Sequence, residues 1–318
     1  MRHDSERAYL ELSAEELAGA VTALDLPLGP LAPGRLGNAT PQAQRAFEDA
    51  LPTLSDTARV LLGDTLATLT DPDRSLKLVA SAGDAYLHRA VYAWKDAGCA
   101  MLASRAGINV LAVATADDIS ATIITPVLPG DGGLPVDVHA ELDGRAVLAL
   151  VGAADALRAG RMAALLGHAP VPESVTAAEV AARLADSMID DPRWTASLFA
   201  SVLPFDASAF MDASTVDLAM GRLAQSGLFA AVERDGAFPA TYHPTDEGLV
   251  ALHTIAGASG RVALTLFEKR ADALAYESIL LISSPFALLM ASLAPEGGGV
   301  APLSAGGLSA LASRITGP

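Results

Sequence analysis

The sequence predicts an α+β fold made of two related halves, with helices packed on antiparallel sheet. A helical stretch leads into short apolar strands twice along the 318 residues, at 69–79 and again at 258–267. The links between successive strands are too short for the crossovers that parallel strands require. A repeated order of elements is typical of a duplicated scaffold. We therefore expect residues 75–128 to share their topology with residues 261–315.

Helix signals dominate the first seventy residues. Ser13 and Glu16 form a capping box ahead of apolar residues at helical spacing. Residues 27–41 are rich in proline and glycine and predict a loop. Thr40 then supplies the N-cap of a second helix, which begins with a proline at its first position. A third helix is expected over residues 55–69.

Strand signals follow the third helix. Apolar and polar residues alternate from Leu76 to Ser81, as in a half-buried strand. Further strands are predicted at 86–94, 100–104, 109–115 and 120–128. The acidic pair Asp117 and Asp118 predicts a turn or a helix cap. A proline- and glycine-rich stretch at 126–135 predicts the boundary between the halves.

The middle of the chain is predicted to be helical. Residues 143–166 are expected to form one long helix, and Thr176 begins another with a capping box. Asp191 and its proline neighbour predict the start of a third helix. Ser214 is the expected cap of a fourth, which ends near Gly227.

The last sixty residues predict a second strand series and a final helix. The series passes through Tyr276, as the first series passes through Tyr92. The apolar run at 279–293 predicts two buried strands around a turn, because it is too short and too interrupted to span a bilayer. Its expected core residues are Leu280, Ile282, Leu288 and Met290. Ser304 is the predicted N-cap of the closing helix.

Charge and cysteine content narrow the classes of function. The formal net charge is −16, and the three lysines are Lys77, Lys95 and Lys269. Such a chain repels nucleic acid at long range, so the expected partner is a protein with a basic or apolar surface. Cys99 is the one cysteine, which excludes an internal disulfide framework and predicts a small core residue. The charged N-terminal stretch lacks an apolar signal core, so a cytoplasmic location is expected.

Motifs for catalysis and cofactor binding are missing from the sequence. HExxH, GxxxxGK[ST] and GxSxG do not occur. His243 and His253 lie near Asp246 and Glu247, yet His243 is better interpreted as part of a turn into a helix cap. We therefore assign no catalytic, cofactor-binding or metal-binding residue, and predict that the protein is not an enzyme.

Residues 176–256 resemble a winged-helix unit. They offer three helices, the hairpin-like stretch GLFAAVERDGAFPATYH and a closing helix opened by Thr245. Between Val171 and Ala256, however, four arginines face twelve acidic residues. A helix that reads duplex DNA needs cations to neutralise phosphates. The resemblance therefore implies protein binding or a structural role. The alternative function is a winged-helix transcription regulator whose α+β part senses a ligand or dimerises.

The chain as a whole resembles EspG-type chaperones of type VII (ESX) secretion systems. The resemblance rests on LELSAEELAGAV, on LTDPDRSLKL leading into strands, and on the ending GVAPLSAGGLSALASRI. It implies a pseudo-twofold fold with a central antiparallel sheet, and a chaperone that binds partner proteins before secretion. We accordingly predict a non-catalytic protein-binding module. Its expected halves are residues 1–130 and 131–318, the latter containing the winged-helix-like segment and the strands and helix of 261–318.

Overall fold

The computed structural model describes residues 2–4, 9–34, 36, 39–83, 85–96, 98–105, 107–128, 138–186, 191, 193–207, 212–232, 240–271, 273–285 and 287–317. The elements of the N-terminal half are β1 (Arg2–Asp4), β2 (Tyr9–Ser13), α1 (Ala14–Ala23), α2 (Pro41–Ala50), η1 (Leu51–Thr53), α3 (Asp56–Thr70), β3 (Arg74–Ala82), β4 (Ala85–Lys95), β5 (Gly98–Arg105), β6 (Ile108–Val113), α4 (Ala116–Ile124) and η2 (Thr125–Val127).

The elements of the C-terminal half are β7 (Ala140–Leu142), α5 (Gly144–Gly167), β8 (Val175–Thr176), α6 (Ala177–Asp186), α7 (Thr195–Ala200), α8 (Ala213–Gln225), β9 (Phe229–Val232), β10 (Thr241–Pro244), α9 (Asp246–Ala256), β11 (Gly260–Arg270), β12 (Ala273–Ser283), β13 (Leu288–Ala294), β14 (Gly297–Pro302) and α10 (Ala305–Thr316). In the part of the chain that the structure describes, we find no helix with the length and apolarity needed to cross a membrane.

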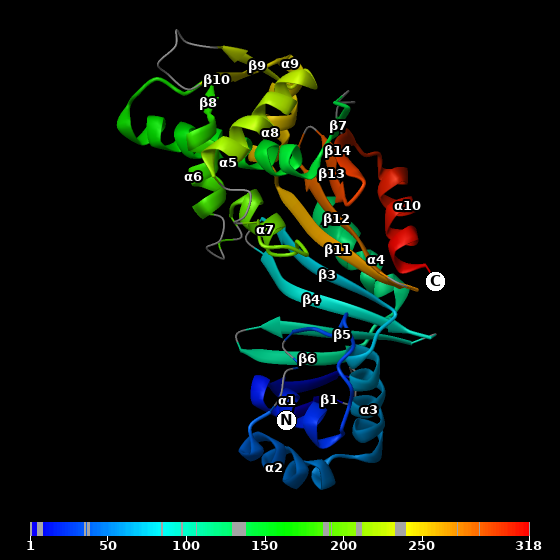
Figure 1. Cartoon of the computed structure of the whole chain (residues 1–318). Coiled ribbons are helices and arrows are strands. Elements are labelled where there is room, and N and C mark those ends of the chain that lie inside the picture. The colour runs from blue at the N-terminus through cyan, green and yellow to red at the C-terminus, as the bar shows by residue number, and fades with distance from the viewer. Residues whose placement is uncertain are drawn as a thin grey trace.

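One antiparallel sheet joins the two halves. Its strand order is β1-β2-β6-β5-β4-β3-β11-β12-β13-β14-β7. The seam lies between β3 and β11, whose paired residues run from Arg74 opposite Glu268 to Ala82 opposite Gly260. From this seam each half continues outward as a four-stranded meander followed by a helix, α4 or α10 (Figure 1). The fold is therefore α+β with two related halves, and the predicted repeat of strand order is present.

The sheet has two different faces. On the α4/α10 face, Leu76, Leu78 and Tyr92 pack in one core with residues of α4 and α10. The opposite face, here called the groove face, carries two helical groups at its ends. Helices α1 to α3 cover the outer strands of the N-terminal half, and α5 to α9 lie over the C-terminal half (Figure 1).

The two tyrosines do not correspond to each other. The Tyr92 hydroxyl lies 3.4 Å from the Thr122 hydroxyl of α4, on the α4/α10 face. Tyr276 packs against the core of the groove face instead. The order of the strands thus repeats between the halves. The position of the tyrosine, which suggested the repeat in the sequence, does not.

Three predicted elements differ from the structure. The strand expected at 120–128 is helical, because Thr115 and Asp118 form a capping box that begins α4. The helix expected from Asp191 begins at Thr195, since the Asp191 carboxylate accepts hydrogen bonds from the Arg193 side chain. The N-cap of α8 is Asp212, to which the expected cap Ser214 donates its hydroxyl.

The other helix starts agree with the prediction. Side chains cap α1, α2, α6, α9 and α10 at Ser13, Thr40, Thr176, Thr245 and Ser304. The 143–166 helix is α5, with Asp143 as its N-cap. Of the predicted boundary at 126–135, residues 129–135 lie outside the described part of the chain.

The apolar run near the C-terminus forms β12 and β13, as predicted. Leu280 and Ile282 are fully buried on the groove face, opposite Ala291 and Leu289. Leu288 is buried on the α4/α10 face, and Met290 is only partly buried there. The prediction that these four residues form one core was wrong. Leu288 and Met290 pair with Ser283 and Leu281, so they project from the other face of the sheet.

Candidate protein-binding groove

A row of cross-strand neighbours forms the floor of a hollow on the groove face. Leu102 of β5 pairs with Val91 of β4, and Val91 pairs with Lys77 of β3. Directly paired residues of an antiparallel sheet project from the same face. Leu102 is buried under the N-terminal helices, Val91 is half-buried and Lys77 is exposed. The row therefore emerges from a covered end into an open middle.

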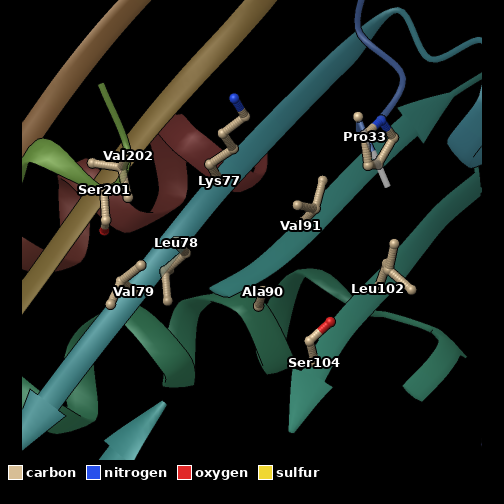
Figure 2. Close-up of a pocket in the computed structure, with 11 residues that line it drawn as sticks. Pro33, Lys77, Leu78, Val79, Ala90, Val91, Leu102, Ser104, Ser201 and Val202 are labelled. Atoms are coloured by element: carbon tan, nitrogen blue, oxygen red, sulfur yellow. The ribbon is translucent and has the colours of Figure 1, made fainter. Parts of the chain in front are cut away.

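Two loops wall this hollow, one from each half. Pro33 and Gly34 come from the connection between α1 and α2, whereas Ser201 and Val202 follow α7. Figure 2 shows Lys77, Val91 and Leu102 on neighbouring strands, with Pro33 on one side and Ser201 and Val202 on the other. The enclosed volume is about 190 Å³. We call this hollow the sheet groove.

The electrostatics of the sheet groove are simple. The Lys77 ammonium lies 5.0 Å from the centre of the Phe267 ring, a distance suited to a cation–π contact. The Ser104 hydroxyl donates to the Asn109 side-chain oxygen at 2.7 Å. The groove thus offers an apolar floor with one cationic rim residue, in a chain whose net charge is −16.

Cys99 and Asp155, whose pKa values are raised by burial, lie outside the sheet groove and have structural roles. Burial raises the pKa of the Cys99 thiol to about 12, so this sulfur stays protonated at neutral pH. Burial also raises the pKa of the Asp155 carboxyl, whose Oδ2 accepts a hydrogen bond from the Ala196 amide at 2.7 Å. That bond anchors the start of α7, which leads into one wall of the groove.

The histidines named in the sequence do not meet as ligands. His253 of α9 accepts from the Arg161 guanidinium at 2.9 Å, while His243 lies on β10. Burial and, to a smaller extent, Arg161 lower the pKa of His253. Among the described residues, no group of three or more His, Cys, Asp or Glu side chains is placed to hold a metal ion.

In the described part of the winged-helix-like segment, the arginines have acidic partners. β9 and β10 pair antiparallel, and Thr245 begins α9 as expected. Arg222 of α8 forms an ion pair with Asp143 at the start of α5. Asp217 accepts a hydrogen bond from the Tyr242 hydroxyl at 2.7 Å. The helix proposed to enter DNA therefore presents little free positive charge.

A wider hollow lies beside α10 under the β11–β12 hairpin. Its volume is about 560 Å³, and its lining includes Glu268, Arg270, Glu277 and Arg314. The Arg314 guanidinium donates to both oxygens of Glu277 at 2.7 and 3.0 Å. Arg270 lies 3.7 Å from Glu268. These four charges therefore pair with one another, and Glu296 adds one further carboxylate to the lining.

The residues of the sheet groove were not predicted as a site. The strands that carry Lys77, Val91 and Leu102 were predicted from the sequence, but the part of the sheet that would remain uncovered was not. One available signal was Lys77 itself, a rare lysine in the middle of an apolar strand.

No family model and no curated protein matches the sequence. Among solved structures, the chain is similar to the type VII secretion system chaperone EspG5 of Mycobacterium tuberculosis, whose structure was determined in complex with a PE25–PPE41 dimer. The two chains share 11% identity over 97% of this chain and 95% of that chain, with a TM-score of 0.48. This similarity agrees with the resemblance seen in the sequence.

Proposed function

We propose that the protein is a non-catalytic adaptor or chaperone, and that the sheet groove receives an apolar segment of a partner protein. The observation that carries the proposal is the row of Leu102, Val91 and Lys77, which runs from a covered end at Leu102 to an open stretch between two helical groups. Pockets for small molecules usually enclose about 300–1,000 Å³. At about 190 Å³, the sheet groove has room for one or two partner side chains rather than for a metabolite.

The repeat within the fold supports this reading. The seam sets Leu78 opposite Leu264 at the centre of the β3–β11 ladder, so Lys77 and Val91 correspond to Ala263 and Leu280 in the other half. Ala263 and Leu280 are fully buried beneath the C-terminal helices. The same position is therefore covered in one half and open in the other, which suits insertion of a partner segment.

We also propose an evolutionary origin, a location and a more specific role for the protein. Residues 1–130 and 131–318 are the products of an internal duplication, with the winged-helix-like segment at 176–256 as an addition to the second copy. The partner binds by protein–protein contact in the cytoplasm, and the function within the adaptor class is a chaperone for secretion or assembly.

The test is co-purification of tagged full-length protein from its native host. A stoichiometric polypeptide should accompany the wild type and be lost from Val91→Arg and Lys77→Glu. Val60→Arg on the exposed side of α3 is the matched control and should retain it, because Val60 is 62% exposed and does not line the groove. Retention of the polypeptide by Val91→Arg, with an unchanged melting temperature, would exclude the sheet groove as its site.

The regulator alternative is tested by a DNA mobility shift at physiological salt. We expect no sequence-selective binding, because Arg222 is paired with Asp143 and Asp217 lies on the same helix. Binding at sub-micromolar protein to a fragment near its own gene would replace the adaptor with a regulator.

A further inference from the structure

Helix α5 has two parts with opposite environments. From Ala146 to Asp155 every residue is buried, since the sheet and the other C-terminal helices surround this part. Beyond Arg161 the helix is exposed apart from Ala164. Met162, Leu165 and Leu166 are 50%, 70% and 84% exposed. The last turns of α5 thus expose apolar side chains within the C-terminal helical group of Figure 1.

These side chains share one side of the helix. Arg158, Arg161, Met162, Leu165 and Leu166 follow the spacing i, i+3, i+4, i+7 and i+8, which places them on a single stripe. Single exposed leucines are common on protein surfaces, whereas a continuous apolar stripe marks an interaction site. We call these five residues the α5 tip.

The α5 tip is held in place by the chain that follows it. Helix α5 ends at Gly167, and the cap residue His168 that follows has a left-handed backbone with φ 51°. The chain then turns back, and Pro172 packs so closely on Gly160 that a β-carbon there would lie 2.8 Å from the proline ring. The stripe is consequently presented by a braced helix rather than by a loose end.

Charge at the α5 tip is opposite to that of the whole chain. Residues 156–172 contain Arg158 and Arg161 and no carboxylate, while the chain carries −16. The Arg161 guanidinium donates to His253, whose lowered pKa keeps this ring neutral at pH 7. Arg158 donates to the Arg193 carbonyl and stacks on Trp194 at 5.0 Å. Arg161 therefore retains a positive charge beside the apolar stripe.

We infer that the α5 tip docks an amphipathic helix of another protein, one that carries carboxylates beside its apolar stripe. Leucine-type side chains of that helix would cover Leu165, Leu166 and Met162, as in other helix-in-groove and helix-on-helix contacts. A glutamate or aspartate of that helix would form a charge-assisted pair with Arg161. A second copy of this chain fits less well, because it would bring the same two arginines to a self-complementary contact. This surface is separate from the sheet groove and does not depend on it.

The test uses two synthetic helical peptides of about 18 residues, long enough to form helix on binding. Both carry the same leucine stripe, one flanked by glutamates and the other by lysines. In fluorescence anisotropy with the full chain, the glutamate peptide should bind at least about tenfold more tightly than the lysine peptide. Leu165→Ser and Leu166→Ser should each weaken it by about tenfold, and Arg161→Gln should reduce the dependence of affinity on salt.

Matched variants separate this surface from the alternatives. Leu218→Ser on α8 removes a leucine that is 68% exposed beside Asp217, and it should leave affinity unchanged. Val91→Arg in the sheet groove should also leave it unchanged, so failure of one proposal does not imply failure of the other. Equal binding of both peptides, or full binding by Leu165→Ser, would overturn the inference. So would a dimer in sedimentation that Leu166→Ser dissolves, since the occupant would then be a second copy.

Discussion

The two halves share a sheet and differ in what covers its groove face. In the N-terminal half, α1, α2 and α3 cover β5, β6 and part of β4. In the C-terminal half, the long helix α5 lies over β13 and β14, α7 lies over β11, and α9 lies over β12 and β13. Helices α6 and α8 pack on α5, next to a small three-stranded sheet. On the α4/α10 face the halves remain alike, with one equivalent helix each, and these two helices contact each other.

This difference shows that the sheet is a common frame and that the covering determines the open surface. Val91 and Leu280 hold equivalent positions next to the seam, yet only Leu280 is fully covered. The sheet groove exists because the N-terminal helices stop short of the seam while the C-terminal ones reach it. The open surface that we propose as a binding site thus requires no change in strand order.

The largest expected effect distinguishes these two positions directly. Leu280→Asp should abolish soluble expression, because an unpaired buried charge costs several kcal/mol. Val91→Asp, at the equivalent open position, should remain soluble with a small change in melting temperature. Soluble yield and the melting temperatures of the purified variants show whether the two positions differ in burial. Soluble Leu280→Asp with unchanged melting would mean that the two halves are covered alike.

The next effect concerns the junction between the halves. Gly260 of β11 lies so close to the Pro126 carbonyl that a β-carbon would sit 1.7 Å from its oxygen. Gly260→Ala should therefore lower the free energy of unfolding by about 1–3 kcal/mol or more, because η2 must move. Gly63→Ala in α3, where the added carbon meets nothing within 4 Å, should instead stabilise by about 0.5–1 kcal/mol. Urea unfolding measures both changes, and equal stability of the two variants would refute the close contact.

A thiol comparison then tests whether the halves open together. Cys99 occupies in β5 the position that Leu288 takes in β13. Its thiol is partly buried, and its pKa of about 12 leaves it protonated at pH 8, so it should react with a thiol reagent mainly when the protein opens. A Cys99→Ala/Leu288→Cys variant should be labelled at a similar rate if the seam unfolds as one unit. Much faster labelling of Cys99 would show that the N-terminal half opens alone.

The smallest effect compares the caps of α4 and α10. Thr115→Ala and Ser304→Ala should each cost about 1 kcal/mol, and Thr115→Ala should cost more because it also removes the hydroxyl bonded to Asp118. The hydrogen bonds from Thr115 lower the pKa of Asp118. A lowered pKa stabilises the folded state above the ordinary aspartate value near 3.9, and this contribution disappears as the pH falls through the folded value. The difference in melting temperature between wild type and Thr115→Ala should accordingly become smaller below about pH 4. A difference that stays constant with pH would argue against the Asp118 contact.

Local signals in the sequence predicted most of the fold. Capping residues such as Ser13, Thr176 and Ser304 marked helix starts, because a side-chain oxygen has to satisfy free backbone amides there. The short links gave the antiparallel order. Residues 120–128 were mistaken for a strand because a short apolar run does not distinguish a strand from a buried helix.

The candidate sites were harder to predict, since both depend on distant contacts. Val91 becomes a groove residue only because the seam joins β3 to β11, about 180 positions later in the chain. Leu165 and Leu166 look like any apolar helix residues in the sequence. Their exposure follows from the length of α5 relative to the body that surrounds its first half.

The seam also sets the order in which the protein can be completed. During synthesis, β3 emerges long before β11, its partner from Gly260 to Glu268. Until then the edge of β3 is a row of unpaired backbone groups that favours pairing with other chains. The N-terminal half is therefore exposed to aggregation for the time needed to make some 180 further residues, and domains fold in the order of synthesis. We expect release of the N-terminal half alone to give insoluble material, whereas the full chain closes the edge with its own strand.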